Sequence, residues 1–200
     1  MDNITGHVIT SKYAVRENYY SAIEIFRGVK SKGVNPIAIT VDGNTSVIRA
    51  IKEVWPEIII QRCKTHIQMQ GLAWLRRPPK LKVSKELQKV FLILSNINSK
   101  QDMDFFIAEF GRWEKKYGEY TKLLPKNHKV YSDIQRAYSL IVHALFNMFH
   151  YLKDNNVAAT TNKLEGYFAQ LKGRYRQHKG MSKTNRQNYL KWYIYLRNKQ

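Results

Sequence analysis

The stretch "NPIAITVDGNTSVIRAIKEVWPEIIIQ", residues 35–61, decides the fold class of this chain. Its first part is a short apolar run bounded by Pro36 and Gly43, a pattern that predicts a buried strand. The run "TSVIRAIKEVWP" then supplies a capping threonine or serine and a stop at Pro56, which predict a helix. The apolar face of this helix comprises Ile48, Ile51 and Trp55. "EIIIQ", residues 57–61, predicts a second buried strand.

The residues before this stretch extend the same alternation. "HVITSKYAV", residues 7–15, has the β-branched and apolar character of a strand, and residues 17–33 predict a helix that stops at Gly33. The helical spacing rests on Tyr19, Ile23, Phe26 and Val29. The order strand, helix, strand, helix, strand predicts an α/β layer with a largely parallel sheet.

The chain changes character after this layer. From Lys64 to Asn155 the sequence predicts no strand, short helices over 84–96 and 102–116, and breaks at "RRPPKLK" and "LLPKNHK". One long helix is predicted from the four- and three-residue steps of Ile134, Tyr138, Ile141, Leu145, Met148 and Leu152. We therefore expect three parts: a partial sheet with helices over 1–62, a helical insertion over 63–155, and a helix with a basic tail over 156–200.

The composition points to a polyanionic partner. The 200 residues include 34 Lys and Arg against 15 Asp and Glu, a net charge of +19 that attracts nucleic acid. A basic membrane-surface protein is the competing class, but the sequence has no apolar stretch long enough to span a bilayer and no signal segment at its start. The single cysteine excludes an internal disulfide and fits a reducing compartment. We expect a soluble, intracellular protein.

Two carboxylates are candidates for chemistry. Asp42 follows the first strand of the opening stretch, and ligand sites of open α/β sheets lie outside the carboxyl ends of their strands. Glu165 starts a helix whose other charges are basic. It forms a stripe with Ala169, Lys172 and Arg176, beside an expected core stripe of Leu164, Phe168, Leu171 and Tyr175. From Lys163 to Gln200 there are ten basic residues and one acid, a surface that suits phosphates.

Each carboxylate also has a simpler interpretation. Asn162 can cap the last helix, with Glu165 as the capping-box partner three residues later. The pair Asp42 and Gly43 can be turn chemistry alone.

A cysteine and a histidine, Cys63 and His66, have the spacing of metal ligands. A structural zinc site needs four ligands and the chain has no second cysteine pair, so a buried cysteine beside a hydrogen-bonded histidine is the simpler interpretation. The segment from Arg62 to Lys89 has eight basic residues and one acid, which predicts either a second phosphate-facing surface or a solvated helix face.

Two blocks resemble one family. "VDGNTSVIRAIKEVWPEIIIQRCKTH", Val41–His66, and "TTNKLEGYFAQLKGRYRQHKG", Thr160–Gly180, resemble the second-aspartate and terminal-glutamate blocks of the Mutator-like transposases of prokaryotic insertion sequences. These belong to the DDE group and have a ribonuclease H-like fold. The resemblance extends less distinctly to residues 16–34.

The resemblance implies a DNA cleavage and strand-transfer site that binds two Mg²⁺ ions, with Mn²⁺ as substitute. It makes Asp42 and Glu165 catalytic metal ligands and the pair Cys63 and His66 a family marker. The basic residues that would hold the DNA backbone are Lys172, Arg174, Arg176 and Lys179. Self-association on paired transposon ends and a cytoplasmic, nucleoid-associated location are further expectations.

The chain departs from the family at one point. The family's first aspartate lies on a strand upstream of the region that matches here, and Asp2 is a poor substitute for it. The resemblance therefore predicts an N-terminally truncated catalytic fold that is inactive by itself. The alternatives are a non-catalytic DNA-binding or regulatory remnant of a transposase and, ranked last, an RNA-binding module.

Overall fold

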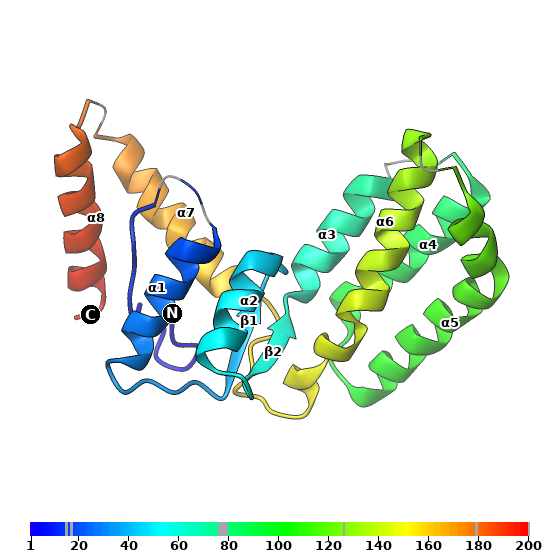
Figure 1. Ribbon diagram of the computed structural model, residues 1–200, viewed down its shortest axis with the longest axis horizontal. Coiled ribbons are helices and arrows are strands. Elements are labelled where there is room, and N and C mark those ends of the chain that lie inside the picture. The colour runs from blue at the N-terminus through cyan, green and yellow to red at the C-terminus, as the bar shows by residue number, and fades with distance from the viewer. Residues whose placement is uncertain (15, 17, 76–79, 126, 179, 200) are drawn as a thin grey trace. The chain divides into compact units, whose positions relative to one another are not determined.

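The chain folds into two compact units, whose helices and strands are drawn in Figure 1. Each unit has its own hydrophobic core. The structure, a computed structural model, describes residues 1–14, 16, 18–75, 80–125, 127–178 and 180–199. The first unit combines Met1–Ile60 with Thr161–Gln200, and the second comprises Gln61–Thr160. The second unit is therefore a continuous insertion between two segments of the first.

The first unit opens with the predicted α/β alternation. Its elements are α1 (Tyr19–Lys30), β1 (Ala38–Val41), α2 (Thr45–Val54) and the first half of β2 (Ile59–Arg62), a strand that continues into the second unit. A capping box between Asn18 and Ser21 starts α1, and Gly33, with φ 78°, turns the chain after it. The two helices lie side by side (Figure 1). Their shared core comprises Ala22, Ile23, Val29, Val41, Ala50, Ile51, Val54, Trp55, Ile58 and Ile60.

The two strands pair in parallel and confirm the α/β class. They are less buried than predicted. In β1 only Val41 is buried, and in β2 Ile59 is exposed. Because α1 and α2 supply the core, a residue whose side chain points to the other face of the sheet stays accessible.

The predicted strand over 7–15 is wrong for the described residues 7–14, which pair with no neighbouring strand. The backbone of this segment is instead hydrogen-bonded by the side-chain amide of Asn198. The Val8 N–H donates to Asn198 Oδ1 at 3.0 Å, and Asn198 Nδ2 donates to the Val8 carbonyl at 3.0 Å. The N-terminal segment is thus bonded to the end of the chain rather than to a sheet.

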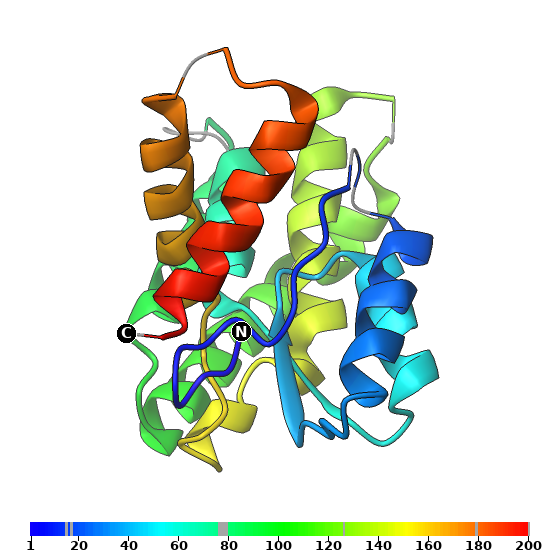
Figure 2. The ribbon, with the colours of Figure 1, turned by 90° about the vertical axis from the view of Figure 1, so that its left-hand side faces the viewer.

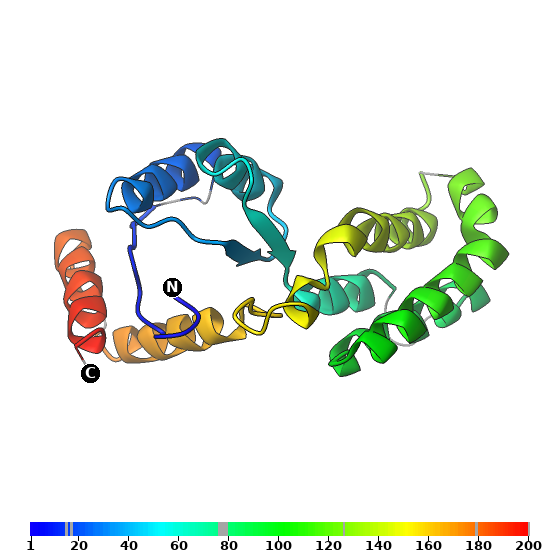
Figure 3. The ribbon, with the colours of Figure 1, turned by 90° about the horizontal axis from the view of Figure 1, so that it is seen from below.

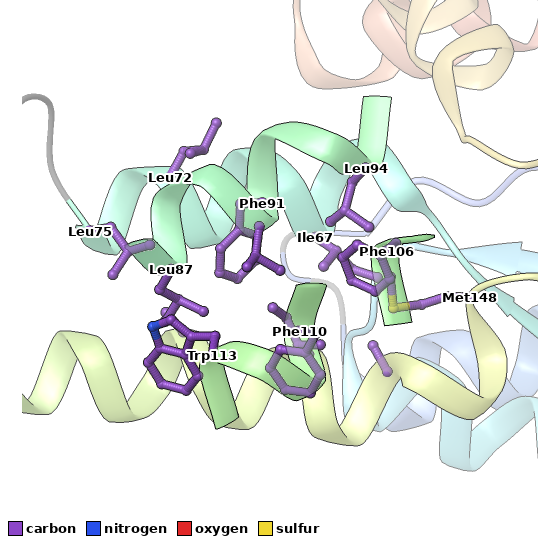
Figure 4. Close-up of a cluster of buried hydrophobic side chains, with 14 of the residues drawn as sticks. Ile67, Leu72, Leu75, Leu87, Phe91, Leu94, Phe106, Phe110, Trp113 and Met148 are labelled. Carbon is purple, nitrogen blue, oxygen red and sulfur yellow. The ribbon is translucent and has the colours of Figure 1, made fainter. Parts of the chain in front are cut away.

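The second unit is helical, and its described residues contain no strand after Arg62, as predicted. It comprises α3 (Lys64–Leu75), α4 (Lys82–Ile93), η1 (Leu94–Asn96), α5 (Lys100–Leu123), α6 (Lys129–Ala144), η2 (Leu145–Asn147) and η3 (His150–Leu152). Figure 4 shows its core. Phe106, Phe110 and Trp113, one and two turns apart on α5, stack with ring centroids 6.5 and 6.4 Å apart.

The predicted long helix through Leu152 is wrong beyond Ala144, where α6 gives way to two 3₁₀ turns. The buried Gln61 side chain bonds the backbone there. Its Nε2 donates to the Met148 carbonyl at 2.7 Å, and its Oε1 accepts from the Tyr151 N–H at 3.4 Å. Met148 is nevertheless buried, so the apolar spacing of the predicted helix still places this side chain in the core after α6 has ended.

The C-terminal segment of the first unit forms two helices, α7 (Asn162–Arg176) and α8 (Lys183–Arg197), which lie side by side in Figure 2. Pairs of tyrosine rings pack between the two helices. The ring centroids of Tyr167 and Tyr193 are 5.9 Å apart, and those of Tyr175 and Tyr189 are 6.4 Å apart. The expected core stripe of α7 is mostly accessible. Leu171 is buried, whereas Leu164 and Tyr175 are half-buried and Phe168 is exposed.

Candidate active site and nucleic-acid interface

Asp42 lies on the surface directly after β1 and before α2. One of its carboxylate oxygens, Oδ1, accepts the Asn44 N–H at 3.0 Å across Gly43, whose φ is 107°. The turn interpretation is therefore present in the structure, and it fixes the carboxylate at the carboxyl end of a strand. Asn44, rather than the predicted threonine or serine, caps α2 by accepting the N–H groups of Ser46 and Val47 at 3.0 and 3.4 Å.

Glu165 lies exposed in the first turn of α7. The predicted capping box with Asn162 is wrong, because Asn162 is the first residue of the helix and Thr161 is its N-cap. The Thr161 hydroxyl instead donates to Glu165 Oε1 at 2.5 Å. A carboxylate suits the N-terminal end of a helix, and the neighbouring hydroxyl fixes the position of one of its oxygens.

Asp42 and Glu165 belong to the same compact unit although they are far apart in sequence. Within the described part of the chain, no three His, Cys, Asp or Glu side chains form a group that could hold a metal ion. Asp2 serves a local turn: its Oδ1 accepts both the N–H and the hydroxyl of Thr5, at 2.6 and 2.8 Å. The Thr5 N–H in particular holds the pKa of this carboxyl below its ordinary value.

The expected DNA-holding cations lie on the second half of α7. Lys172, Arg174 and Arg176 are all exposed, and Lys179 is outside the described residues. The chain has no acid after Glu165, so cations dominate both α7 and α8. A polyanion approaching these two helices meets no carboxylate beyond the first turn of α7.

The marker pair belongs to the second unit. Cys63 is fully buried, and its Sγ lies 3.2 Å from His66 Nδ1 in the first turn of α3. This is the buried cysteine and hydrogen-bonded histidine of the simpler interpretation. The helix α3 itself was not predicted from the sequence. Ile67, Leu72 and Leu75 are buried on it, but the apolar residues of this segment do not form one stripe that would have signalled a helix.

The sequence interpretation missed two residues that position the carboxylates, Asn44 and Thr161. Both are of residue types that favour helix N-caps, and each directly precedes a helix. The choice among neighbouring candidates, "NTS" before α2 and "TTN" before α7, is made by the backbone geometry of the turn. That geometry has no local sequence signature.

A family model described as "Transposase, Mutator family" matches residues 4–133. The match covers more than half of the chain, and the chain therefore belongs to the Mutator family of transposases. The matched residues include Asp42, Cys63 and His66, whereas Glu165 and the cations of α7 and α8 follow the matched region. No curated protein and no solved structure matches the sequence. Among the described residues, no helix combines the length and the apolar character needed to cross a bilayer.

Proposed function

We propose that this chain carries part of the catalytic domain of a DDE-type transposase, which cleaves DNA and transfers its strands. The observation that carries the proposal is the position of Asp42, at the carboxyl end of β1 and inside the region that matches the Mutator family. The parallel strands with α1 and α2 on them support a ribonuclease H-like sheet. DNA is the partner that the family implies, with self-association on paired DNA ends.

Asp42 and Glu165 would hold the metal. Carboxylate oxygens are the ligands that Mg²⁺ prefers, so the chemistry of this donor pair fits the ion. When bound, Mg²⁺ or Mn²⁺ supplies charge stabilisation for the attacking and leaving oxygens of a phosphodiester. The Thr161 hydroxyl orients one oxygen of Glu165, and the Asn44 N–H orients one oxygen of Asp42. Lys172, Arg174 and Arg176 would hold the DNA backbone through its phosphates.

Metal binding tests the site directly. We expect titration with Mn²⁺, followed by calorimetry, to show binding that weakens about tenfold or more in Asp42→Asn and in Glu165→Gln, because each variant removes an anionic ligand. Glu57→Gln is the matched control, since Glu57 is an exposed acid of the same unit that precedes β2. Equal affinities in Glu165→Gln and Glu57→Gln would remove Glu165 from the proposal.

We also propose that the polypeptide alone does not cleave DNA. The resemblance implies three carboxylates, of which the chain matches two, and loss of one metal ligand should nearly abolish catalysis. The test is nicking of a supercoiled plasmid in Mg²⁺ or Mn²⁺, where we expect no product above background. Nicking that disappears in Asp42→Ala would overturn this statement and strengthen the catalytic assignment of Asp42.

A non-catalytic DNA-binding or regulatory role is the second candidate, and the exposed cations of α7 favour it. Binding driven by counterion release would be steeply salt-dependent and would survive Glu165→Ala. The catalytic proposal predicts instead that Mg²⁺ strengthens DNA binding and that Glu165→Ala removes the increase. A gel-shift titration with and without Mg²⁺ separates the two candidates.

A further inference from the structure

The outer face of α8 carries large aromatic side chains that the fold does not use. Trp192 is 62% exposed and Tyr195 is 50% exposed. Their rings contact each other edge to face, with centroids 5.6 Å apart. The aromatic residues that join α8 to α7, Tyr189 and Tyr193, lie on the inner face and are half-buried. The outer pair is therefore available to a partner.

Two exposed cations lie near this pair. Lys191 lies next to Trp192 and is exposed, and the Lys199 Nζ lies 4.7 Å from the centre of the Tyr195 ring. No acid occurs anywhere on α8. An aromatic face with cations at its edges is complementary to a ligand that has both flat rings and negative charges. Nucleobases joined by phosphates have both.

We propose that Trp192 and Tyr195 stack on unpaired bases of DNA, with Lys191 and Lys199 on the adjoining phosphates. A duplex keeps its base faces stacked inside, so side chains on a convex helix reach them only where the strands have separated. The site would thus hold DNA that is locally opened rather than the intact duplex. The proposal rests on the proposed function only in taking DNA as the nucleic acid.

The test measures two probes on the full chain: a fluorescein-labelled oligo(dT) and a duplex of equal length, both by anisotropy at one salt concentration. We expect Trp192→Ala and Tyr195→Ala to weaken oligo(dT) binding about 5- to 150-fold, the range that one stacked base contributes. Duplex affinity should change less than about twofold, since the cations remain. Trp192→Phe should retain most of the oligo(dT) affinity because a ring remains.

Tyr20→Ala is the matched control, since Tyr20 is an exposed aromatic residue on α1 and its loss should leave both affinities unchanged. Intrinsic fluorescence adds a readout on the unmodified chain. Of the other three tryptophans, Trp55 and Trp113 are buried and Trp74 is half-buried, so most of the quenching by oligo(dT) should be lost in Trp192→Phe and retained in Trp74→Phe.

Several outcomes would overturn the inference. One is unchanged oligo(dT) affinity in both alanine variants, and another is an equal loss on duplex and oligo(dT). Tighter binding of an RNA oligonucleotide than of oligo(dT), dissociation of a dimer by Trp192→Ala, or binding to anionic vesicles that Trp192→Ala removes would each assign the face to another partner. If the wild-type chain binds neither DNA probe, the proposed function fails. If it binds both probes and the two alanine variants bind oligo(dT) as tightly as the wild type, only the inference about α8 fails.

Discussion

At the residue scale, the Gln61 side chain satisfies two backbone groups in the 3₁₀ turns that follow α6. It is fully buried and bonds both the Met148 carbonyl and the Tyr151 N–H. We expect Gln61→Leu to destabilise the second unit by about 1–3 kcal/mol, because two buried backbone groups lose their partner. Urea unfolding measures the change. Gln70→Ala, an exposed glutamine on α3, should cost less than about 0.5 kcal/mol, and an equal loss in both variants would contradict this role.

Two glycines of the second unit should respond in opposite directions to the same substitution. A Cβ at Gly71 would lie less than 3.0 Å from the Phe91 ring, where α3 packs on α4, whereas a Cβ at Gly111 on α5 would meet nothing within 4 Å. We expect Gly71→Ala to destabilise the unit by about 1–3 kcal/mol through overpacking. Gly111→Ala should stabilise it by about 0.5–1 kcal/mol through helix propensity.

The comparison is by thermal unfolding of the two variants beside the wild type. Gly71→Ala with an unchanged midpoint would show that the Phe91 ring moves aside at little cost. A rise in midpoint for Gly111→Ala would also exclude a general intolerance of alanine in these helices.

At the scale of elements, the capping box of α5 links a helix to pH. The Ser99 Oγ accepts the Asp102 N–H, and Asp102 Oδ2 accepts the N–H groups of Asn98 and Ser99 at 3.0 and 2.9 Å. These bonds, that from Asn98 foremost, lower the pKa of Asp102 below its ordinary value of 3.8. A lowered carboxyl pKa gives stability that is present above the unfolded-state pKa and lost as the pH falls through the folded-state pKa.

We therefore expect Asp102→Asn to reduce the stability of the second unit near neutral pH, and the difference from wild type to vanish as the pH falls below 3.8. Denaturant unfolding across that acidic range measures it. Asp104→Asn is the control, because Asp104 lies exposed on the same helix beyond its first turn. A difference that persists unchanged in acid would mean that packing, not the ionised cap, accounts for the loss.

Local patterns predicted the elements whose partners are close in sequence. The Pro36 and Gly43 boundaries of β1, the apolar period of α2 and its stop before Pro56 are all present. The wrong predictions depend on distant residues. Gln61 bonds the backbone of the 3₁₀ turns that follow α6, and Asn198 bonds the backbone at Val8. A periodic sequence contains no information about such contacts.

The candidate site follows the same division. Asp42 and Glu165 were identifiable because a strand end and a helix start are local features. Which residue caps each helix depends on the turn that precedes it, so Asn44 and Thr161 were not distinguished from their neighbours. The exposed face of α8 could not be predicted either, because only the packing on α7 decides which of its aromatic rings are covered.

At the scale of the whole molecule, the net charge of +19 makes salt the strongest external variable for DNA binding. Lys172, Arg174 and Arg176 are exposed on α7. Replacing all three by alanine should make the slope of log K against log salt less negative by about 3, since each phosphate contact contributes about 0.9. Affinities for a duplex at several salt concentrations give the slope.

The control removes the same charge elsewhere. Lys100, Lys115 and Lys153 are exposed cations of the second unit, and their triple alanine variant has the same net charge as the α7 variant. If the two triple variants change the slope equally, DNA responds to the total charge and α7 makes no specific phosphate contacts.

The insertion has a consequence for how the chain is made. The Lys64 N–H donates to the Ala159 carbonyl at 3.1 Å, so the two ends of the second unit meet in the folded state. That unit is continuous and can fold as soon as Thr160 leaves the ribosome. The first unit cannot, because its N-terminal segment is bonded to residues that are synthesised later. This segment lies beside α7 (Figure 3); the Asn3 carbonyl accepts a hydrogen bond from Lys163 Nζ, and the Val8 N–H donates to Asn198 Oδ1. We expect ribosome-stalled chains ending near residue 160, with a tether added, to show a protease-resistant helical unit beside a protease-sensitive N-terminus. Equal protection of both segments would contradict this order, in which the proposed metal ligand Asp42 is made early and folds last.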